Sequence, residues 1–252
     1  MAMSQRLDIL DFDTPDEELP NYEPQTAPSY DVEVQEMPLV TYHLRQVDRK
    51  LQRFVCYESP AAPSYKIIAN YFRLFTKKPE LEVLRVQRGA EAEKTVASIQ
   101  FVNNGPLPWR PRANVSHDGS NGRSTLAMEA RNFSDWTIAI GGNTYTWTIE
   151  GRPISLVLRK ANANVIMAKF TYSTYGTAAA YGAEVGELSI YRDELSATSD
   201  WIERTICGLM VAIVHFKKTG RQYCNAEVGR VGSVSRADAP LHRSSVISWA
   251  TM

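Results

Sequence analysis

The sequence has few cysteines and no long apolar run, and both shortages restrict the class of protein. Its three cysteines (Cys56, Cys207, Cys224) are too few and too scattered for a disulfide framework or a zinc site. The longest apolar run, 206–214, has nine residues, whereas a helix needs about 20 to cross a bilayer. The N-terminal residues MAMSQRLDILDFD lack the basic start and apolar core of a signal peptide. We therefore expect a cytoplasmic protein without a transmembrane segment, either freely soluble or peripheral at a membrane.

The chain also lacks an overall charge of one sign. Its 28 basic and 28 acidic residues give a formal net charge of zero, so the composition shows no chain-wide basic surface for nucleic acid. The charges are unevenly distributed, however. Residues 1–36 hold ten acids and one base, a balance of −9, whereas residues 37–220 hold 23 bases and 16 acids, a balance of +7. This asymmetry is typical of an acidic tail that forms a separate, solvated element.

The two ends of the chain have the composition of disordered segments. Residues 1–37 are rich in acids and proline and have no sustained apolar period, and residues 223–252 are rich in arginine, serine, glycine and alanine. Such segments cannot bury enough apolar surface to offset the entropy of ordering. We therefore predict one folded domain, residues 38–222, between two disordered tails.

The folded part consists mainly of short runs in which apolar and polar residues alternate, with many β-branched and aromatic residues, a pattern typical of β-strands. Gly141-Gly142-Asn143 separates two such runs, and this predicts a tight hairpin turn because glycine accepts positive φ. If the runs 65–68 and 71–75 form one bent strand, the folded part has about twelve strands. The runs are 39–44, 51–57, 65–68, 71–75, 81–86, 96–102, 113–116, 124–129, 136–140, 144–149, 154–158, 165–172 and 188–191.

A single helix is predicted at residues 201–219, after the strands. Asp200 can cap its N-terminus, Glu203 has the position of a capping-box acid, and Gly220 can end it. The middle of this helix is apolar on every side, so protein must surround it. Gly208 in its interior predicts a close approach by a strand. We therefore expect a mainly β fold, in which a closed barrel of about twelve strands encloses the hydrophobic C-terminal helix.

This arrangement resembles the tubby C-terminal superfamily, which includes tubby proteins, phospholipid scramblases and LURP-one-related proteins. The resemblance covers residues 38–222. The stretch from Arg131 to Ile140, followed by Tyr145-Thr146-Trp147, is similar to uncharacterised fungal proteins with this domain, which also have acidic N-termini rich in proline and tyrosine. The resemblance implies a tubby-like barrel and the binding of phosphoinositides. It transfers no lipid-binding residue by position.

The N-terminal tail contains a short motif that matches a known class of peptide ligand. Leu19-Pro20-Asn21-Tyr22 fits L-P-x-Y, a variant of the PPxY ligand of WW domains. WW grooves are lined by aromatic side chains and accept extended proline segments at little cost in entropy. Pro28 and Tyr30 repeat the proline–tyrosine spacing in a weaker form. A WW-domain protein is the expected partner, with WW-bearing ubiquitin ligases as one class; the alternative is that proline and tyrosine occur here by chance.

Basic residues cluster near several predicted turns of the folded part. Turns could present these residues to anionic lipid headgroups, although ordinary solvated surface charge is the simpler interpretation. The candidate lipid-binding residues are Arg45, Arg49, Lys50, Arg53, Lys77, Lys78, Arg110 and Arg112.

The sequence contains no recognisable catalytic motif, metal-ligand spacing or cofactor motif. Cys207 and His215 are eight residues apart on the predicted helix, a rise of roughly 12 Å, so a direct cysteine–histidine couple is not expected. We predict a non-catalytic adaptor whose tail presents the L-P-x-Y motif to WW domains. The first alternative is a barrel that binds phosphoinositides or other anionic lipids at a membrane surface. The second is a structural interaction domain with neither activity.

Overall fold

The computed structural model describes residues 37–59, 61–70, 78–87, 93–102, 110–131, 134–140, 142–161, 163, 165–191 and 199–225. The chain divides into two units, Met1–Glu36 and Met37–Met252. The first unit lies outside the described residues, and so does the predicted strand at 71–75.

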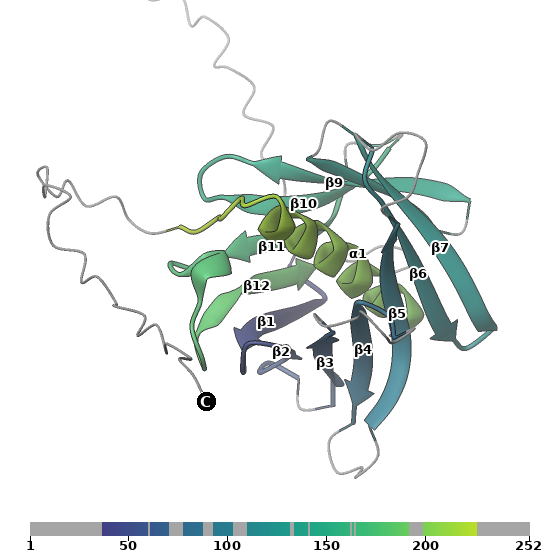
Figure 1. The fold of residues 1–252 in the computed structure, drawn as a ribbon, viewed down its shortest axis with the longest axis horizontal. Helices are drawn as coiled ribbons and strands as arrows, with labels where there is room; N and C mark the ends of the chain where they lie inside the picture. The colour runs from purple at the N-terminus through teal and green to yellow at the C-terminus, as the bar shows by residue number, and fades with distance from the viewer. Residues whose placement is uncertain are drawn as a thin grey trace, which may run out of the picture. The chain divides into compact units, whose positions relative to one another are not determined.

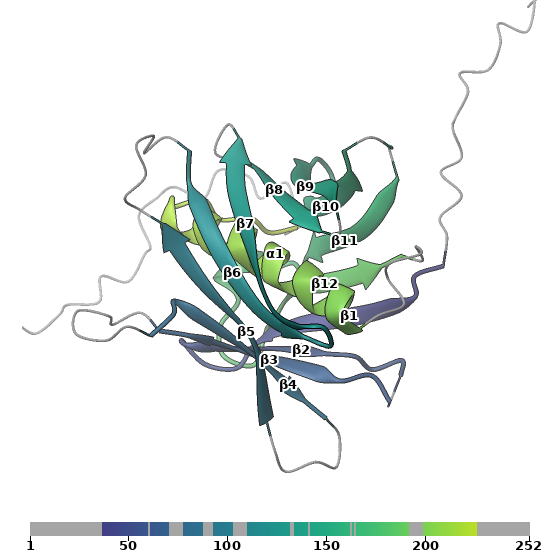
Figure 2. The same cartoon turned by 90° about the vertical axis from the view of Figure 1, so that its right-hand side faces the viewer.

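Twelve antiparallel strands form a closed barrel in which neighbours along the chain are neighbours in the sheet, and β1 closes the ring by pairing with β12 (Figures 1 and 2). This confirms the predicted mainly β barrel of about twelve strands. The strands are β1 (Val40–Gln46), β2 (Leu51–Val55), β3 (Ser64–Ala69), β4 (Leu81–Val86), β5 (Glu93–Val102), β6 (Arg112–Gly119), β7 (Gly122–Arg131), β8 (Asp135–Ile140), β9 (Asn143–Glu150), β10 (Ser155–Lys160), β11 (Ile166–Tyr172) and β12 (Glu184–Ile190).

The alternation of buried and outward-facing side chains along most strands gives the sheet one apolar face. In β3, for example, Tyr65, Ile67 and Ala69 are buried inside the barrel, whereas the residues between them face outward. Successive side chains of a strand point to opposite faces, so one face of the sheet becomes apolar. Closing the sheet buries that face and leaves no exposed strand edge.

The helix α1 (Ser199–Lys218) lies within the barrel (Figures 1 and 2), as predicted from its apolar middle. It begins two residues before the predicted start and ends one residue before the predicted end. A Cβ atom at Gly208 would lie 2.8 Å from Nε1 of Trp147 and 3.6 Å from Cε of Met128. Gly208 therefore permits the close contact between α1 and the wall that its position in the sequence predicts.

The segment 221–225 follows α1 and packs against the barrel, three residues beyond the predicted end of the domain. The ring of Tyr223 lies 5.4 Å from that of Phe216 and 5.7 Å from that of Tyr172. The side chain of Asn225 accepts a hydrogen bond from the backbone N–H of Ile154 and donates to the carbonyl oxygens of Ile154 and Tyr172. These contacts fix the chain that leaves the helix. Among the described residues, no helix has the length and hydropathy needed to span a membrane.

Candidate functional site

A charged group of side chains lies inside the barrel beside the first turns of α1. Glu203 is fully buried. One of its carboxylate oxygens forms an ion pair with Arg85 of β4 and accepts a 2.6 Å hydrogen bond from Nε of that residue. The other oxygen lies 2.8 Å from Nε2 of His117 on β6, which is also fully buried. We call Arg85, His117 and Glu203 the inner ion-pair network; it joins the helix to two strands.

The neighbouring carboxylate on the helix, Asp200, contacts the turn between β6 and β7. Its Oδ2 accepts hydrogen bonds from the backbone N–H of Ser120 at 2.9 Å and from the hydroxyl of Ser120 at 2.7 Å. These hydrogen bonds hold the pKa of Asp200 below its usual value, against the effect of partial burial. Asp200 and Glu203 were predicted to act locally as a helix cap and a capping box. In the structure α1 begins at Ser199, so Asp200 lies inside the first turn and not at the N-cap. Both carboxylates instead accept hydrogen bonds from residues of the strands and their turns.

His117, Asp200 and Glu203 are also the three described residues whose ligand atoms are close enough to hold one metal ion, since those atoms lie within 4.8 Å of one another. A cation there would compete with the guanidinium of Arg85, which already contacts Glu203. Two positive charges beside one buried carboxylate would repel each other. The geometry therefore favours an ion-pair network that holds the helix in the barrel.

The sequence interpretation missed this network, although the strand periodicity contains a signal for it. Arg85 continues the inward series of β4, and His117 continues that of β6. A charged or polar side chain in an inward position needs a protein partner that satisfies its charge or its hydrogen bonds. Glu203 on the enclosed helix is that partner. The sequence does not show how far the helix extends along the barrel axis, so it does not show which helix residue lies level with Arg85 and His117.

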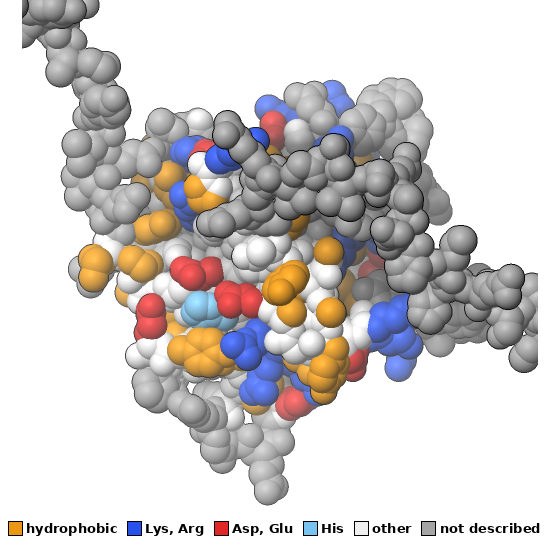
Figure 3. Space-filling model, turned by 90° about the vertical axis from the view of Figure 1, so that its left-hand side faces the viewer, with side chains coloured by type: hydrophobic (Ala, Val, Ile, Leu, Met, Phe, Trp, Pro, Cys, Tyr) orange, Lys and Arg blue, Asp and Glu red, His pale blue; other side chains and the backbone are white. Residues whose placement is uncertain are grey.

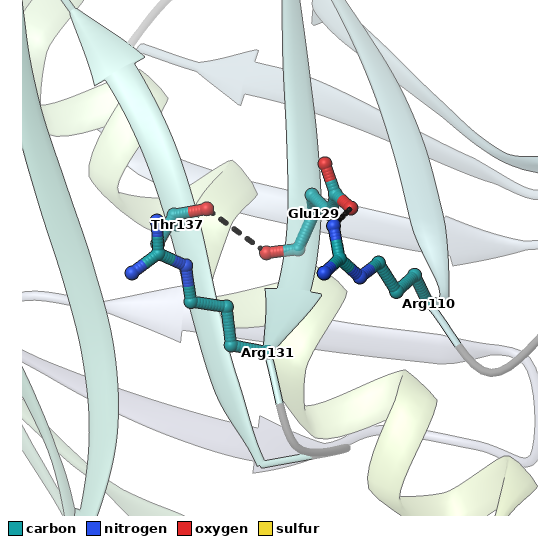
Figure 4. A pocket seen from close by; sticks show the side chains of 4 residues that line it. All are labelled: Arg110, Glu129, Arg131 and Thr137. Carbon is teal, nitrogen blue, oxygen red and sulfur yellow. Dashed lines mark hydrogen bonds and ion pairs between the residues drawn. The ribbon is translucent and has the colours of Figure 1, made fainter. Parts of the chain in front are cut away.

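A second charged group lies on the outside of the barrel, over β6–β8. Arg110 and Arg112 place guanidinium nitrogens 3.6 and 3.7 Å from a carboxylate oxygen of Glu129. Arg110, Glu129, Arg131 and Thr137 line a pocket of about 320 Å³ (Figure 4). Thr137 fixes the local register because its hydroxyl donates to the carbonyl oxygen of Glu129 at 3.0 Å. We call Arg110, Arg112 and Arg131, with Glu129 between them, the outer arginine cluster.

Two other predicted residues, Arg45 and Arg53, lie directly opposite each other in the β1–β2 register. The guanidinium of Arg45 lies 5.5 Å from the ring centre of Tyr57, and Arg53 donates to the hydroxyl of Ser64 at 3.2 Å. Figure 3 shows a face of the barrel on which basic, acidic and hydrophobic side chains are mixed. Three strands, β3–β5, separate β2 from β6 around the ring. The predicted basic residues therefore do not form one continuous patch.

The remaining predicted residues fall in three places. Arg49 and Lys50 lie exposed between β1 and β2, and Lys78 lies exposed before β4. Lys77 is outside the described residues. So are all the predicted partner-binding residues of the tail: Leu19, Pro20, Asn21, Tyr22, Pro28 and Tyr30.

The cysteine and histidine of α1 lie in separate packing environments. Cys207 is fully buried, and this burial raises the pKa of its thiol. The ring of His215 packs edge-on against Trp136 at 5.1 Å. Burial, together with the charges of Arg221 and Lys218, lowers the pKa of His215 to about 4. His215 is therefore a neutral packing residue at neutral pH.

The comparisons with known proteins give no family assignment. No protein-family model, no curated protein and no solved structure matches this chain. The resemblance to tubby-like proteins remains a prediction from the sequence, and the functional argument rests on the geometry of the barrel.

Proposed function

We propose that this protein is a non-catalytic binding protein whose barrel attaches to phosphoinositides at a membrane surface through the outer arginine cluster. The observation that carries the proposal is the grouping of three arginines around a single acid. Arg110, Arg112 and Arg131 contribute three positive charges, and Glu129 contributes one negative charge. The sequence had suggested the first two of these arginines for this role, and the pocket adds Arg131.

The arginines retain donors for a ligand. The distances from Glu129 to Arg110 and Arg112, 3.6 and 3.7 Å, exceed those of a good hydrogen bond. Arg131 forms no ion pair with any residue in the described part of the chain. A guanidinium group presents several N–H donors in a planar fork that matches phosphate oxygens. The cluster is therefore suited to a phosphorylated headgroup.

The filling of the barrel supports a site on its outer surface. The side chains of α1 from Thr205 to Ile213 are buried against the wall. A ligand would therefore meet the outer face of the strands or the loops at the barrel ends. A headgroup at a membrane surface can reach the outer face without any opening of the barrel.

The test is co-sedimentation of the full chain with phosphatidylcholine vesicles that contain or lack a phosphoinositide. The double variant Arg110→Gln/Arg131→Gln should bind the phosphoinositide vesicles about thirtyfold more weakly, since each basic residue near an anionic surface contributes about 1 kcal/mol. Arg123→Gln is the matched control because Arg123 is an exposed arginine near the start of the same strand, β7. Equal binding by the wild type and the double variant would refute the proposal.

A second function is favoured by the sequence motif Leu19-Pro20-Asn21-Tyr22. We propose that it recruits a WW-domain protein, so that the chain acts as an adaptor. Its test is the affinity of the full chain for WW domains. Tyr22→Ala should weaken binding at least about tenfold, whereas Asn21→Ala, at the variable position, should not. If the two variants bind alike, the motif does not act as a WW ligand.

A further inference from the structure

A second pocket forms at the end of the barrel where α1 ends. Three segments far apart in the sequence line its volume of about 390 Å³. This volume lies within the range of small-molecule sites. The chain after β1 contributes Gln46, Asp48 and Arg49, the chain before β12 contributes Ala179, Ala180 and Tyr181, and the helix contributes Lys217. We call this the end pocket.

Backbone hydrogen bonds hold two of these segments together. The backbone N–H of Gln46 donates to the carbonyl oxygen of Ala183 at 3.0 Å. In turn, the carbonyl oxygen of Gln46 accepts from the backbone N–H of Gly182 at 2.7 Å. The side chain of Gln46 also accepts a hydrogen bond from Gln52 at 2.7 Å. The end pocket is therefore built on the ladder between β1 and β12 and does not depend on side-chain contacts alone.

The charges of the end pocket leave an excess of positive charge. Lys217 is half-buried, and it forms no ion pair with a carboxylate within the described ranges. Burial alone lowers the pKa of its ammonium group. A partly desolvated ammonium without a counter-ion is stabilised by any anion that enters.

The acid of the end pocket already has a structural role. Oδ1 of Asp48 accepts hydrogen bonds from the backbone N–H groups of Lys50 and Leu51, at 2.6 and 2.9 Å. Asp48 therefore closes the turn after β1, and among the described residues it forms no ion pair with Lys217. Arg49, which is exposed, supplies the second cation.

We propose that the end pocket binds the phosphate monoester group of a small soluble ligand, with Lys217 and Arg49 contacting the phosphate and Tyr181 packing against an aromatic part. A phosphate monoester carries a charge of about −1.5 to −2 at neutral pH. The two cations and the single acid, Asp48, leave the lining of the end pocket with a net positive charge that attracts it. Tyr181 is 81% exposed, so its ring is available for stacking. The end pocket shares no residue with the outer arginine cluster, and the inference is independent of the proposed membrane function.

The experiment is titration of the full chain with phenyl phosphate, followed by calorimetry or NMR, with inorganic phosphate as the ring-free comparison. Lys217→Met keeps the apolar stem and removes the charge, and it should weaken phenyl phosphate binding at least about tenfold. Lys94→Met is the matched control on an exposed lysine of β5. Arg49→Gln, in a solvent-exposed turn, provides a second variant if Lys217→Met alters the fold.

Each outcome decides the assignment. Saturable phenyl phosphate binding that either end-pocket variant weakens, and that Lys94→Met leaves intact, supports it. An absence of saturable binding, or equal binding by all variants, overturns it. The phosphate monoester could instead belong to a lipid headgroup. This is tested with phosphatidic acid vesicles and the Arg110→Gln/Arg131→Gln chain, in which the outer arginine cluster is weakened. Vesicle binding that requires Lys217, without phenyl phosphate binding, would overturn the assignment to a soluble ligand.

Discussion

The inner ion-pair network and the outer arginine cluster use the same residue types in opposite surroundings. Glu203 is fully buried and has two partners at hydrogen-bonding distance. Glu129 is partly exposed, and its arginine partners lie at 3.6 and 3.7 Å. Burial, and not residue type, therefore distinguishes a charge that holds the fold from a charge that stays accessible at the surface.

The physical basis of this difference is desolvation. A carboxylate inside the barrel has lost its water, so its hydrogen-bond partners must come from the protein. A carboxylate on the outer wall keeps water on one side, and an exposed ion pair contributes about 0–1 kcal/mol. We therefore expect the two groups to respond very differently to matched substitutions.

The largest expected effect comes from Glu203→Ala. This variant leaves Arg85 and His117 without their acid inside the barrel, and breaking a buried pair costs about 3–5 kcal/mol. Glu129→Ala on the outer wall should change the free energy of unfolding by about 1 kcal/mol or less. Urea unfolding of both variants measures the difference. Equal losses would contradict the comparison.

Gly208→Leu tests the space between the helix and the wall. Its side chain would meet the indole of Trp147, since even a Cβ atom lies 2.8 Å from Nε1. Overpacking of a filled core costs about 1–3 kcal/mol, and this site should lie at the upper end of that range. Gly151→Leu is the control because nothing lies within 4 Å of a Cβ atom there. A melting temperature unchanged by Gly208→Leu would disprove the close contact.

The buried histidine gives a pH-dependent prediction. The pKa of His215 is about 4 in the folded chain and about 6.5 in the unfolded chain. Between these values the unfolded state binds a proton that the folded state does not, so stability falls as the pH decreases through this window. We expect a loss of about 3 kcal/mol between pH 6.5 and 4, which His215→Phe should remove. Urea unfolding at both pH values checks this. If the free energy of unfolding of His215→Phe falls with pH as much as that of the wild type, His215 is not the cause.

The barrel could be predicted from the sequence because strand alternation and the all-round apolar helix are local patterns. The position of Gly208 inside the helix also predicted a close approach between the helix and a strand, and the structure identifies Trp147 as the neighbour. Glu203 was assigned only a capping role, because its partners Arg85 and His117 lie far away in sequence. The position of Lys217 near the end of the helix gives no sign of a pocket. Its place in a pocket depends on turns that meet only when β1 pairs with β12.

The outer arginines should have the smallest effect on stability. Arg110→Gln/Arg131→Gln removes two exposed charges, and surface substitutions of this kind usually change the free energy of unfolding by no more than about 0.5 kcal/mol each. Thermal unfolding of the double variant beside Glu203→Ala checks this. A loss comparable to that of Glu203→Ala would mean that the outer cluster also holds the fold.

The most direct test of the central claim is the binding of Glu129→Gln to phosphoinositide vesicles. This substitution removes the one acid among three arginines, so the cluster gains a unit of positive charge while the barrel interior is untouched. We predict about fivefold tighter binding, equivalent to about 1 kcal/mol per unit charge near an anionic surface, without loss of stability. Unchanged or weaker binding by a stably folded Glu129→Gln chain would contradict the assignment of the outer arginine cluster as the ligand-binding surface.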